Sequence, residues 1–163
     1  MGLSRHDPSV APTKAERAAT IDDLLAIPAE ERFHELLAGE IVEKGSPSGE
    51  HAGAQSGLLI RLGPSFQRPP GDGGIGGWWF ATEVEILLEN GSVVRPDVTG
   101  WRRERVPRRP TGVVVKERPD WVCEVLSPSN ASRDTVTKLR IYHQAAVPHY
   151  WILDPREGTL DVM

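Results

Sequence analysis

The sequence predicts a protein of the α/β (α+β) class, built on a central mixed β-sheet flanked by helices. An apolar run at residues 121–126 is typical of a strand buried on both faces. A helical pattern over about residues 132–146 follows it, and residues 149–153 form another apolar strand. This strand–helix–strand order favours a right-handed crossover between parallel strands, whereas the turn at Asn90-Gly91 indicates an antiparallel hairpin. The two kinds of pairing together predict a mixed sheet.

The N-terminal residues divide into a tail and the start of a domain. Residues 1–19 are rich in Pro, Ala and charged side chains, which is typical of a flexible tail. Thr20 then predicts an N-cap, since an acidic first turn and two leucines follow it, and Pro28 ends this short helix. We expect one domain over residues 20–163, long enough to bury its own core.

The elements expected next alternate between hairpins and a helix. Alternating apolar side chains predict a hairpin of residues 33–37 with residues 40–44. Residues 50–62 carry an apolar stripe typical of a helix, and residues 68–77 form a Pro/Gly loop. Residues 78–101 then predict two antiparallel strands around the Asn90-Gly91 turn.

The C-terminal third begins with a basic loop that is interrupted by prolines, at residues 101–112. The apolar strand, helix and strand described above follow this loop. One more strand is expected at residues 159–162.

Composition excludes several classes of protein. Apolar content is ordinary for a globular chain, no apolar run reaches the roughly twenty residues of a membrane span, and no secretory signal is evident. Cys123 is the only cysteine, which excludes internal disulfides and fits a cytoplasmic location. The net charge of −4 does not by itself indicate a nucleic-acid binder, although acidic site residues can mask a basic patch.

Three acidic residues lie where strands are expected. Glu124 interrupts the apolar run near its C-terminal end, and a buried carboxylate needs a cation, a metal or a proton. Asp97 follows the β-branched run at Val93 and Val94, and Glu35 lies between apolar neighbours. Brought together, these carboxylates would suit Mg²⁺, which uses one or two protein carboxylates and keeps several waters. Asp97 as a simple strand-end residue, and Glu35 paired with a cation across its hairpin, are the structural alternatives.

Lys138 lies in the helix that follows the Glu124 strand. Spacing of four residues puts Asp134, Lys138 and Tyr142 on one strip, beside an apolar face that includes Val136 and Leu139. A lysine there could orient an attacking water or neutralise charge in a transition state. A surface lysine paired with Asp134 is the alternative reading, and spacing alone favours it.

Cationic residues elsewhere are candidates for binding nucleic acid. The basic loop contains Arg102, Arg103 and Arg105 next to Trp101, a combination that could hold phosphates and stack a base. His51, at the start of the first long helix, could bind a phosphate. A solvated loop and a capping histidine are the plainer readings.

Three stretches of the chain carry a family resemblance: FHELLAGEIVEKGSPSGEHAGAQSGLLIRL, VVRPDVTGW and PDWVCEVLSPSNASRDTVTKLRIYHQAAVPHYWILDP. Together they resemble the Uma-type family of bacterial endonucleases, which belongs to the restriction-endonuclease-like superfamily with its PD-(D/E)xK hallmark. The resemblance covers about residues 33–155. The family pattern continues beyond Met163, so the domain is expected to be short at its C-terminus.

The resemblance implies roles for individual residues. Asp97, after Pro96, looks like the acid of the PD element, and Glu124 looks like the second acid. Leu126 stands where the superfamily usually has its lysine, and Lys138 corresponds to the lysine that this family carries on the following helix. Glu35 looks like an additional acid, and His51 matches a histidine of the pattern. The implied cofactor is Mg²⁺, with Mn²⁺ as a substitute, and the implied reaction is hydrolysis of DNA phosphodiester bonds.

The function predicted from these observations is a metal-dependent deoxyribonuclease. Asp97 and Glu124 would hold the metal, Glu35 would assist, and Lys138 would position the water. A homodimer would suit the cutting of two strands, by analogy. Two alternatives remain: a nucleic-acid-binding module that keeps the fold without cutting, and an interaction protein whose acids bind only a stabilising ion.

Overall fold

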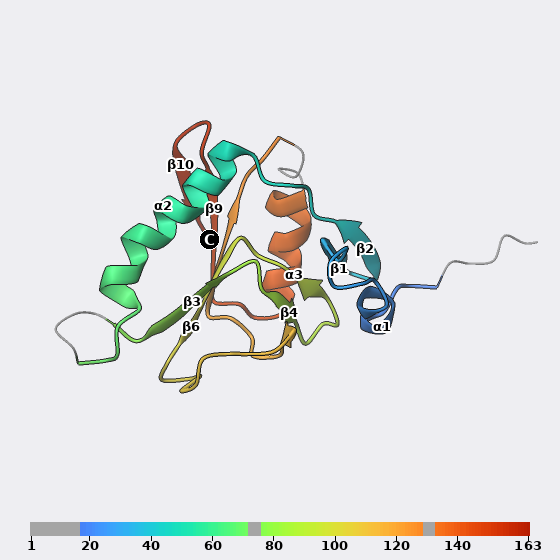
Figure 1. Ribbon diagram of the computed structural model, residues 1–163, viewed down its shortest axis with the longest axis horizontal. Helices are drawn as coiled ribbons and strands as arrows, with labels where there is room; N and C mark the ends of the chain where they lie inside the picture. Colours follow the sequence, from blue (N-terminus) through green and yellow to red (C-terminus); the bar gives the residue numbers. More distant parts are fainter. Residues whose placement is uncertain (1–16, 72–75, 129–132) are drawn as a thin grey trace, which may run out of the picture.

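The computed structural model describes residues 17–71, 76–128 and 133–163 (Figure 1). Most of the predicted tail lies outside these ranges, as do Ser129 and Asn130 of the turn after the Glu124 strand. Arg17–Ala19 are described: Arg17 is paired with Asp23, and the N–H of Ala19 donates to the Gly39 carbonyl at 2.7 Å. Among the described residues, no helix has the length and apolar character needed to span a bilayer.

The α+β class is confirmed, but the strands form two five-stranded mixed sheets where one was expected. In order across the first sheet lie β2 (Glu40–Glu43), β1 (His34–Leu37), β5 (Val93–Val94), β4 (Glu85–Leu87) and β7 (Val114–Val115). In order across the second lie β10 (Thr159–Val162), β9 (His149–Asp154), β8 (Trp121–Val125), β6 (Val98–Arg102) and β3 (Trp78–Thr82). The short β7 pairs parallel with β4 and was not expected from the sequence.

The single hairpin expected at residues 78–101 is divided between the sheets. The chain leaves β3 through Glu83, whose φ of +55° turns it out of the strand, and enters β4 in the first sheet. It returns to the second sheet through Arg95-Pro96-Asp97, where proline cannot continue the ladder. The N–H of Glu83 donates to the Pro96 carbonyl at 3.2 Å, so the two crossing points lie side by side.

The helices and sheets form layers. α1 (Ile21–Leu25) covers the outer face of the first sheet, where Leu24 packs with Leu36 and Val93. α2 (Gly49–Phe66) covers the outer face of the second sheet. α3 (Leu139–Gln144) lies between the sheets in Figure 1 and contributes to the central core.

The N-cap predicted for α1 and the turn predicted for the first hairpin are both present in the structure. The Thr20 side chain and the Asp23 side chain cap each other's backbone N–H groups, which is a full capping box. β1 and β2 pair antiparallel around Ala38 and Gly39, whose φ angles of +52° and +90° match a two-residue hairpin turn. α2 is longer than the predicted helix and continues through Pro64.

The parallel pairing expected at the C-terminal end of the chain is confirmed. β8 and β9 are parallel, and β8 is buried along its whole length. The helix between them begins as a π-helix, η1 (Arg133–Lys138), before α3. Val136 was expected to face the sheet, but its side chain is 56 % exposed, and Lys138 is 1 % exposed instead. The wider π turn shifts which residues face inward relative to a regular α-helix.

Candidate active site

Alternation along the strands directs two of the predicted acids into the space between the sheets. In β1, Leu36 belongs to the outer core under α1 while Leu37 belongs to the central core, so Glu35 shares the inward side with Leu37. In β8, Cys123 packs toward α2 while Val122 packs in the central core, so Glu124 faces inward. Both glutamates are almost fully buried, with exposures of 1 % and 0 %.

Lys138 joins these two carboxylates. Its Nζ lies 2.9 Å from Glu35 Oε1 and 3.0 Å from Glu124 Oε1. Tyr142, one turn later, donates its hydroxyl to Glu124 Oε1 at 2.7 Å, and the backbone N–H of Arg95 donates to Glu35 Oε1 at 2.7 Å. The surface position considered for Lys138 is wrong, because the side chain is enclosed between the sheets.

Asp97 is fixed at the crossing point by three donors. Lys44 Nζ lies 2.8 Å from Oδ1, while His51 Nε2 and the backbone N–H of Val125 reach Oδ2 at 3.1 Å and 2.6 Å. The contact with Val125 sets Asp97 directly against the strand position next to Glu124. Asp97, Glu124, Glu35 and Lys138 therefore meet in one region, although they come from four separate segments.

Lys44 and Glu83 extend this cluster toward the surface. Lys44 donates to Glu83 Oε2 at 3.0 Å and to the Arg95 carbonyl at 2.6 Å, besides Asp97. Gln55 of α2 donates to Glu83 Oε1 and to the Asp97 carbonyl, at 3.2 Å and 2.7 Å. The cluster is thus a network of alternating acids and cations.

These contacts shift pKa values in directions that keep most of the network charged. Burial alone would raise the pKa of Asp97, but His51 and Lys44 outweigh it and hold that pKa well below its usual value. The hydrogen bond to Asp97 raises the pKa of His51 above 6.5. Burial opposes charge on Lys44, yet the carboxylates of Asp97 and Glu124 raise its pKa above the ordinary lysine value.

Two other groups are held toward their neutral forms. Burial is the largest influence on Glu83 and raises its pKa, and the Asp97 charge adds to this, although Lys44 opposes it. Burial together with the Glu124 charge raises the pKa of Tyr142 well above 10, so its hydroxyl remains a donor.

A cavity of about 280 Å³ opens next to the network. Its lining includes Phe33, Lys44, His51, Glu83, Arg95 and Ser127. Three of these side chains are cationic or can become so, and Asp97 lies directly behind Lys44 and His51. The cavity is therefore a route by which an anionic group could approach the buried acids.

The donors in this region fit a hydrated hard cation better than a closed protein cage. Among the described residues, no three His, Cys, Asp or Glu side chains are arranged as a ready-made metal site. Mg²⁺ does not need one, since it usually binds one or two carboxylates and retains waters. Asp97 with Glu124 or Glu83 supplies such carboxylates, and the Arg95 carbonyl, already in contact with a cationic nitrogen, is a further hard oxygen.

The arginine loop is remote from this cavity. Arg102 ends β6 while Asp97 precedes it, a separation of about 16 Å along a strand. Arg105 is bound to Asp120, and Arg103 lies over the Trp79 ring at 3.6 Å. Trp101 is 1 % exposed, so the idea that it stacks a base is wrong. A role for the arginines in binding nucleic acid stays a prediction.

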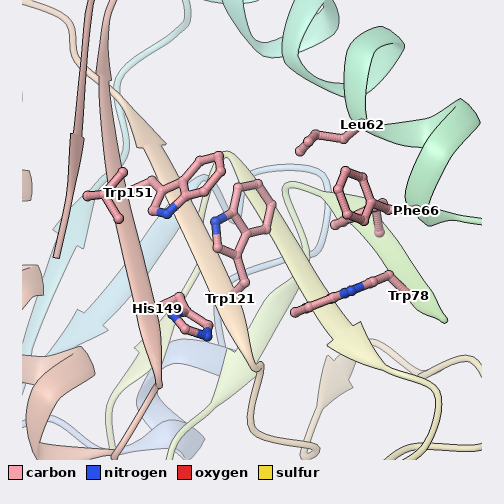
Figure 2. A pocket seen from close by; sticks show the side chains of 8 residues that line it. Leu62, Phe66, Trp78, Trp121, His149 and Trp151 are labelled. Carbon is pink, nitrogen blue, oxygen red and sulfur yellow. The ribbon is translucent and has the colours of Figure 1, made fainter. Parts of the chain in front are cut away.

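A second cavity, of about 290 Å³, has a different character (Figure 2). Trp121 and Trp151 project into it from the neighbouring strands β8 and β9, with Trp78 from β3, while Leu62 and Phe66 face them from α2. Of the described residues that line it, His149 alone has an ionisable side chain, and the cavity lies on the α2 side of the sheet, opposite to Glu124. This cavity offers apolar contact and no hydrolytic chemistry.

Two mixed sheets with acids and a lysine at their junction define a protein with a nuclease-like fold. The profile of the Uma2 family, described as "Putative restriction endonuclease", matches residues 21–163. The chain therefore belongs to the Uma2 family.

A solved structure supports the same fold. The crystal structure of a "putative nuclease belonging to DUF820" from Anabaena variabilis ATCC 29413 matches with a TM-score of 0.73 and 23 % identity. The match covers 88 % of this chain and 78 % of that chain. No curated protein matches the sequence.

Lys44 and Gln55 are residues of the network that the sequence pattern does not single out, whereas Glu83 shares a strand face with Glu85 and could be expected near the site, though no motif assigns it a role. Lys44 follows a strand of alternating apolar residues and looks like an ordinary solvent-facing lysine. The one usable signal was the hairpin register, which sets Lys44 beside Phe33 and hence near Glu35; the N–H of Lys44 donates to the Phe33 carbonyl at 2.7 Å. Glu83 joins the network only because the chain changes sheets there.

Proposed function

We propose that this protein is an endonuclease that hydrolyses DNA phosphodiester bonds with the help of a divalent metal ion, Mg²⁺ or Mn²⁺. The observation that carries the proposal is the buried meeting of Asp97, Glu124, Glu35 and Lys138 beside an open cavity with cationic walls. Membership of a family described as restriction endonucleases supports the same reaction class.

In this proposal Asp97 and Glu124 hold the metal. When bound, the ion supplies Lewis-acid polarisation of a phosphoryl oxygen and a lowered pKa for its water. Asp97 is suited to this role because its pKa is depressed and its carboxylate stays ionised at neutral pH. Tyr142 fixes one oxygen of Glu124 and limits the rotation of that side chain.

Lys138 and Glu35 act as positioning residues. The Lys138 ammonium contacts Glu35 and Glu124 directly, so it orients both carboxylates and adds a positive charge beside the proposed metal ligand Glu124. This differs from direct contact between Lys138 and the attacking water. His51 and Arg95 line the cavity and would favour the approach of a phosphate anion.

A cleavage assay tests the proposal. Supercoiled plasmid, linear duplex, single-stranded DNA and RNA would be incubated with the protein in Mg²⁺, Mn²⁺ or EDTA. We expect cleavage of DNA only with metal, and a loss of about 100-fold or more in rate for Asp97→Asn and Glu124→Gln. Asp120→Asn is the matched control, because Asp120 is a buried acid paired with Arg105 at the far end of β6.

Circular dichroism would verify that each variant is folded. Cleavage by Asp97→Asn at the wild-type rate would assign the activity to a contaminant and reject the proposal. DNA binding with a steep salt dependence and no metal-dependent cleavage would instead support the module that keeps the fold without cutting.

A further inference from the structure

Lys44 has an unusual environment for a lysine near the end of an edge strand. Its ammonium group contacts three oxygens from three residues: Asp97 Oδ1, Glu83 Oε2 and the Arg95 carbonyl, at 2.8, 3.0 and 2.6 Å. An ammonium group has three N–H donors, so these contacts use all of them. The side chain is 12 % exposed and lies at the wall of the cavity.

The oxygens that surround the Lys44 ammonium group are of the types that coordinate a hard metal cation. Two carboxylates and a main-chain carbonyl are typical ligands of Mg²⁺ and Ca²⁺. The Glu124 carboxylate also raises the pKa of Lys44, so the acid proposed as the second metal ligand acts on this same charge. Lys44 thus neutralises the carboxylates that a divalent ion would neutralise.

An ammonium group and a divalent ion cannot occupy this position together. Both would bind at Oδ1 of Asp97, where the ammonium nitrogen already lies 2.8 Å away, and positive charges a few ångströms apart repel each other strongly in a partly buried site. The second oxygen of Asp97 offers no alternative, since His51 and the Val125 N–H already donate to it.

The cavity beside Lys44 offers space into which its ammonium group can move. Lys44 lines the cavity, and its flexible four-carbon stem lets the charged end move without any change in the backbone. His51, which is 4 % exposed and lines the same cavity, has an Nδ1 atom without a hydrogen-bond partner among the described residues.

We infer that Lys44 is an internal counter-ion of the active site: its ammonium group occupies the cation position at Asp97 and must move into the cavity when a divalent ion binds. This inference rests on the proposed function, because it takes Asp97 to be a metal ligand. It adds that, before metal binds, Lys44 compensates the negative charge of Asp97, and that metal affinity depends on the displacement of Lys44.

Metal affinity measured by calorimetric titration of Mn²⁺ tests the inference without any assay of activity. We expect Lys44→Met to bind Mn²⁺ at least about tenfold more tightly than wild type, because no ammonium group competes for Asp97. Arg95→Met is the matched control: it removes a positive charge that also contacts Glu83, at 3.3 Å, but touches no Asp97 oxygen in the described contacts. Its affinity should change by much less. Equal affinities for Lys44→Met and wild type, or equal gains for both variants, would overturn the inference.

A second measurement uses the wild-type protein and so does not depend on the folding of a variant. Reductive methylation of Lys44, followed by mass spectrometry, should be slow in EDTA and should accelerate in saturating Mg²⁺, as the ammonium group leaves its three acceptors. Lys116, which is exposed, should react at one rate under both conditions. An unchanged Lys44 rate with Mg²⁺ bound would contradict the displacement.

The outcomes separate the two proposals. Mn²⁺ binding that is equal in wild type and Lys44→Met leaves the proposed nuclease intact and removes only the role of Lys44. Absence of Mn²⁺ binding in every variant at millimolar concentration counts against metal dependence itself, and the inference fails with it.

Discussion

Lys138 illustrates how a charged residue can be a core residue. It is among the largest fully buried side chains of the protein, yet its ammonium group contacts two buried carboxylates. Such a cluster is tolerable only while every charge has a partner, because an uncompensated buried charge is costly. The same contacts that orient Glu124 therefore also stabilise the fold.

Replacing Lys138 should reveal this stabilisation. Lys138→Met leaves Glu35 and Glu124 without their shared cation, and we expect the free energy of unfolding at pH 7 to fall by about 3–5 kcal/mol. Urea denaturation followed by circular dichroism measures it. Adding Glu35→Gln and Glu124→Gln to Lys138→Met should recover part of the loss. Lys116→Met, on the surface, should change the stability by no more than about 0.5 kcal/mol, and a loss that small for Lys138→Met would contradict the role described here.

Among the elements, β6 and β8 show how backbone placement determines side-chain packing. Gly100 of β6 lies under the aromatic rings of β3, and a Cβ atom there would come within 2.9 Å of the Phe80 ring and 3.2 Å of the Trp78 ring. The Phe80 ring is stacked on Trp78 and meets Trp121 edge-on, so it has little freedom to move away. Position 100 requires glycine because the aromatic side chains of the neighbouring strand β3 leave no room for a Cβ atom. The backbone conformation of Gly100 itself is not the reason.

Gly100→Ala should therefore destabilise the protein by about 1–3 kcal/mol through overpacking. Gly57→Ala is the control, because Gly57 lies inside α2 and a Cβ atom added there would meet nothing within 4 Å. There alanine should stabilise the helix by about 0.5–1 kcal/mol. Thermal unfolding of both variants measures the difference, and changes of the same sign would show that the Phe80 contact is unimportant.

At the scale of the whole molecule, the active-site network links stability to pH. Asp97 has a depressed pKa when folded, so it stabilises the folded state above its unfolded pKa of about 3.9, and this contribution is lost as pH falls toward the folded value. His51 has a raised pKa, so its contribution is full below about 6.5 and is lost as pH rises through the folded value. The pair stabilises most between these limits.

Chemical denaturation of wild type and Asp97→Asn from pH 3 to pH 9 tests this linkage. The difference in unfolding free energy should be largest near pH 5–6 and should begin to shrink below about pH 4, because the unfolded chain then binds a proton at Asp97 that the folded state does not bind. The pKa of His51, followed by NMR, should fall toward 6.5 in Asp97→Asn. A stability difference that is independent of pH would show that Asp97 is not the source of the acid sensitivity.

Much of the candidate site could be predicted from the sequence, because local sequence patterns indicate several of its residues. A carboxylate inside an apolar strand identified Glu124, and the Thr20 cap, the Ala38-Gly39 turn and the parallel crossover follow from local propensities and chain handedness. The family motifs pointed to Asp97, Glu35 and Lys138. What each of these residues contacts was not contained in any of those patterns.

Only the tertiary structure decided that the sheet divides in two, that Lys138 is buried, and that Lys44 and Glu83 join Asp97. The physical reason is the distance along the chain: even the nearer partners Glu124 and Lys138 are 14 positions apart, and Lys44 and Asp97 are 53 positions apart. No local period encodes such a meeting. It arises where the chain crosses between the sheets at Glu83 and at Pro96 and brings the ends of several strands to one place.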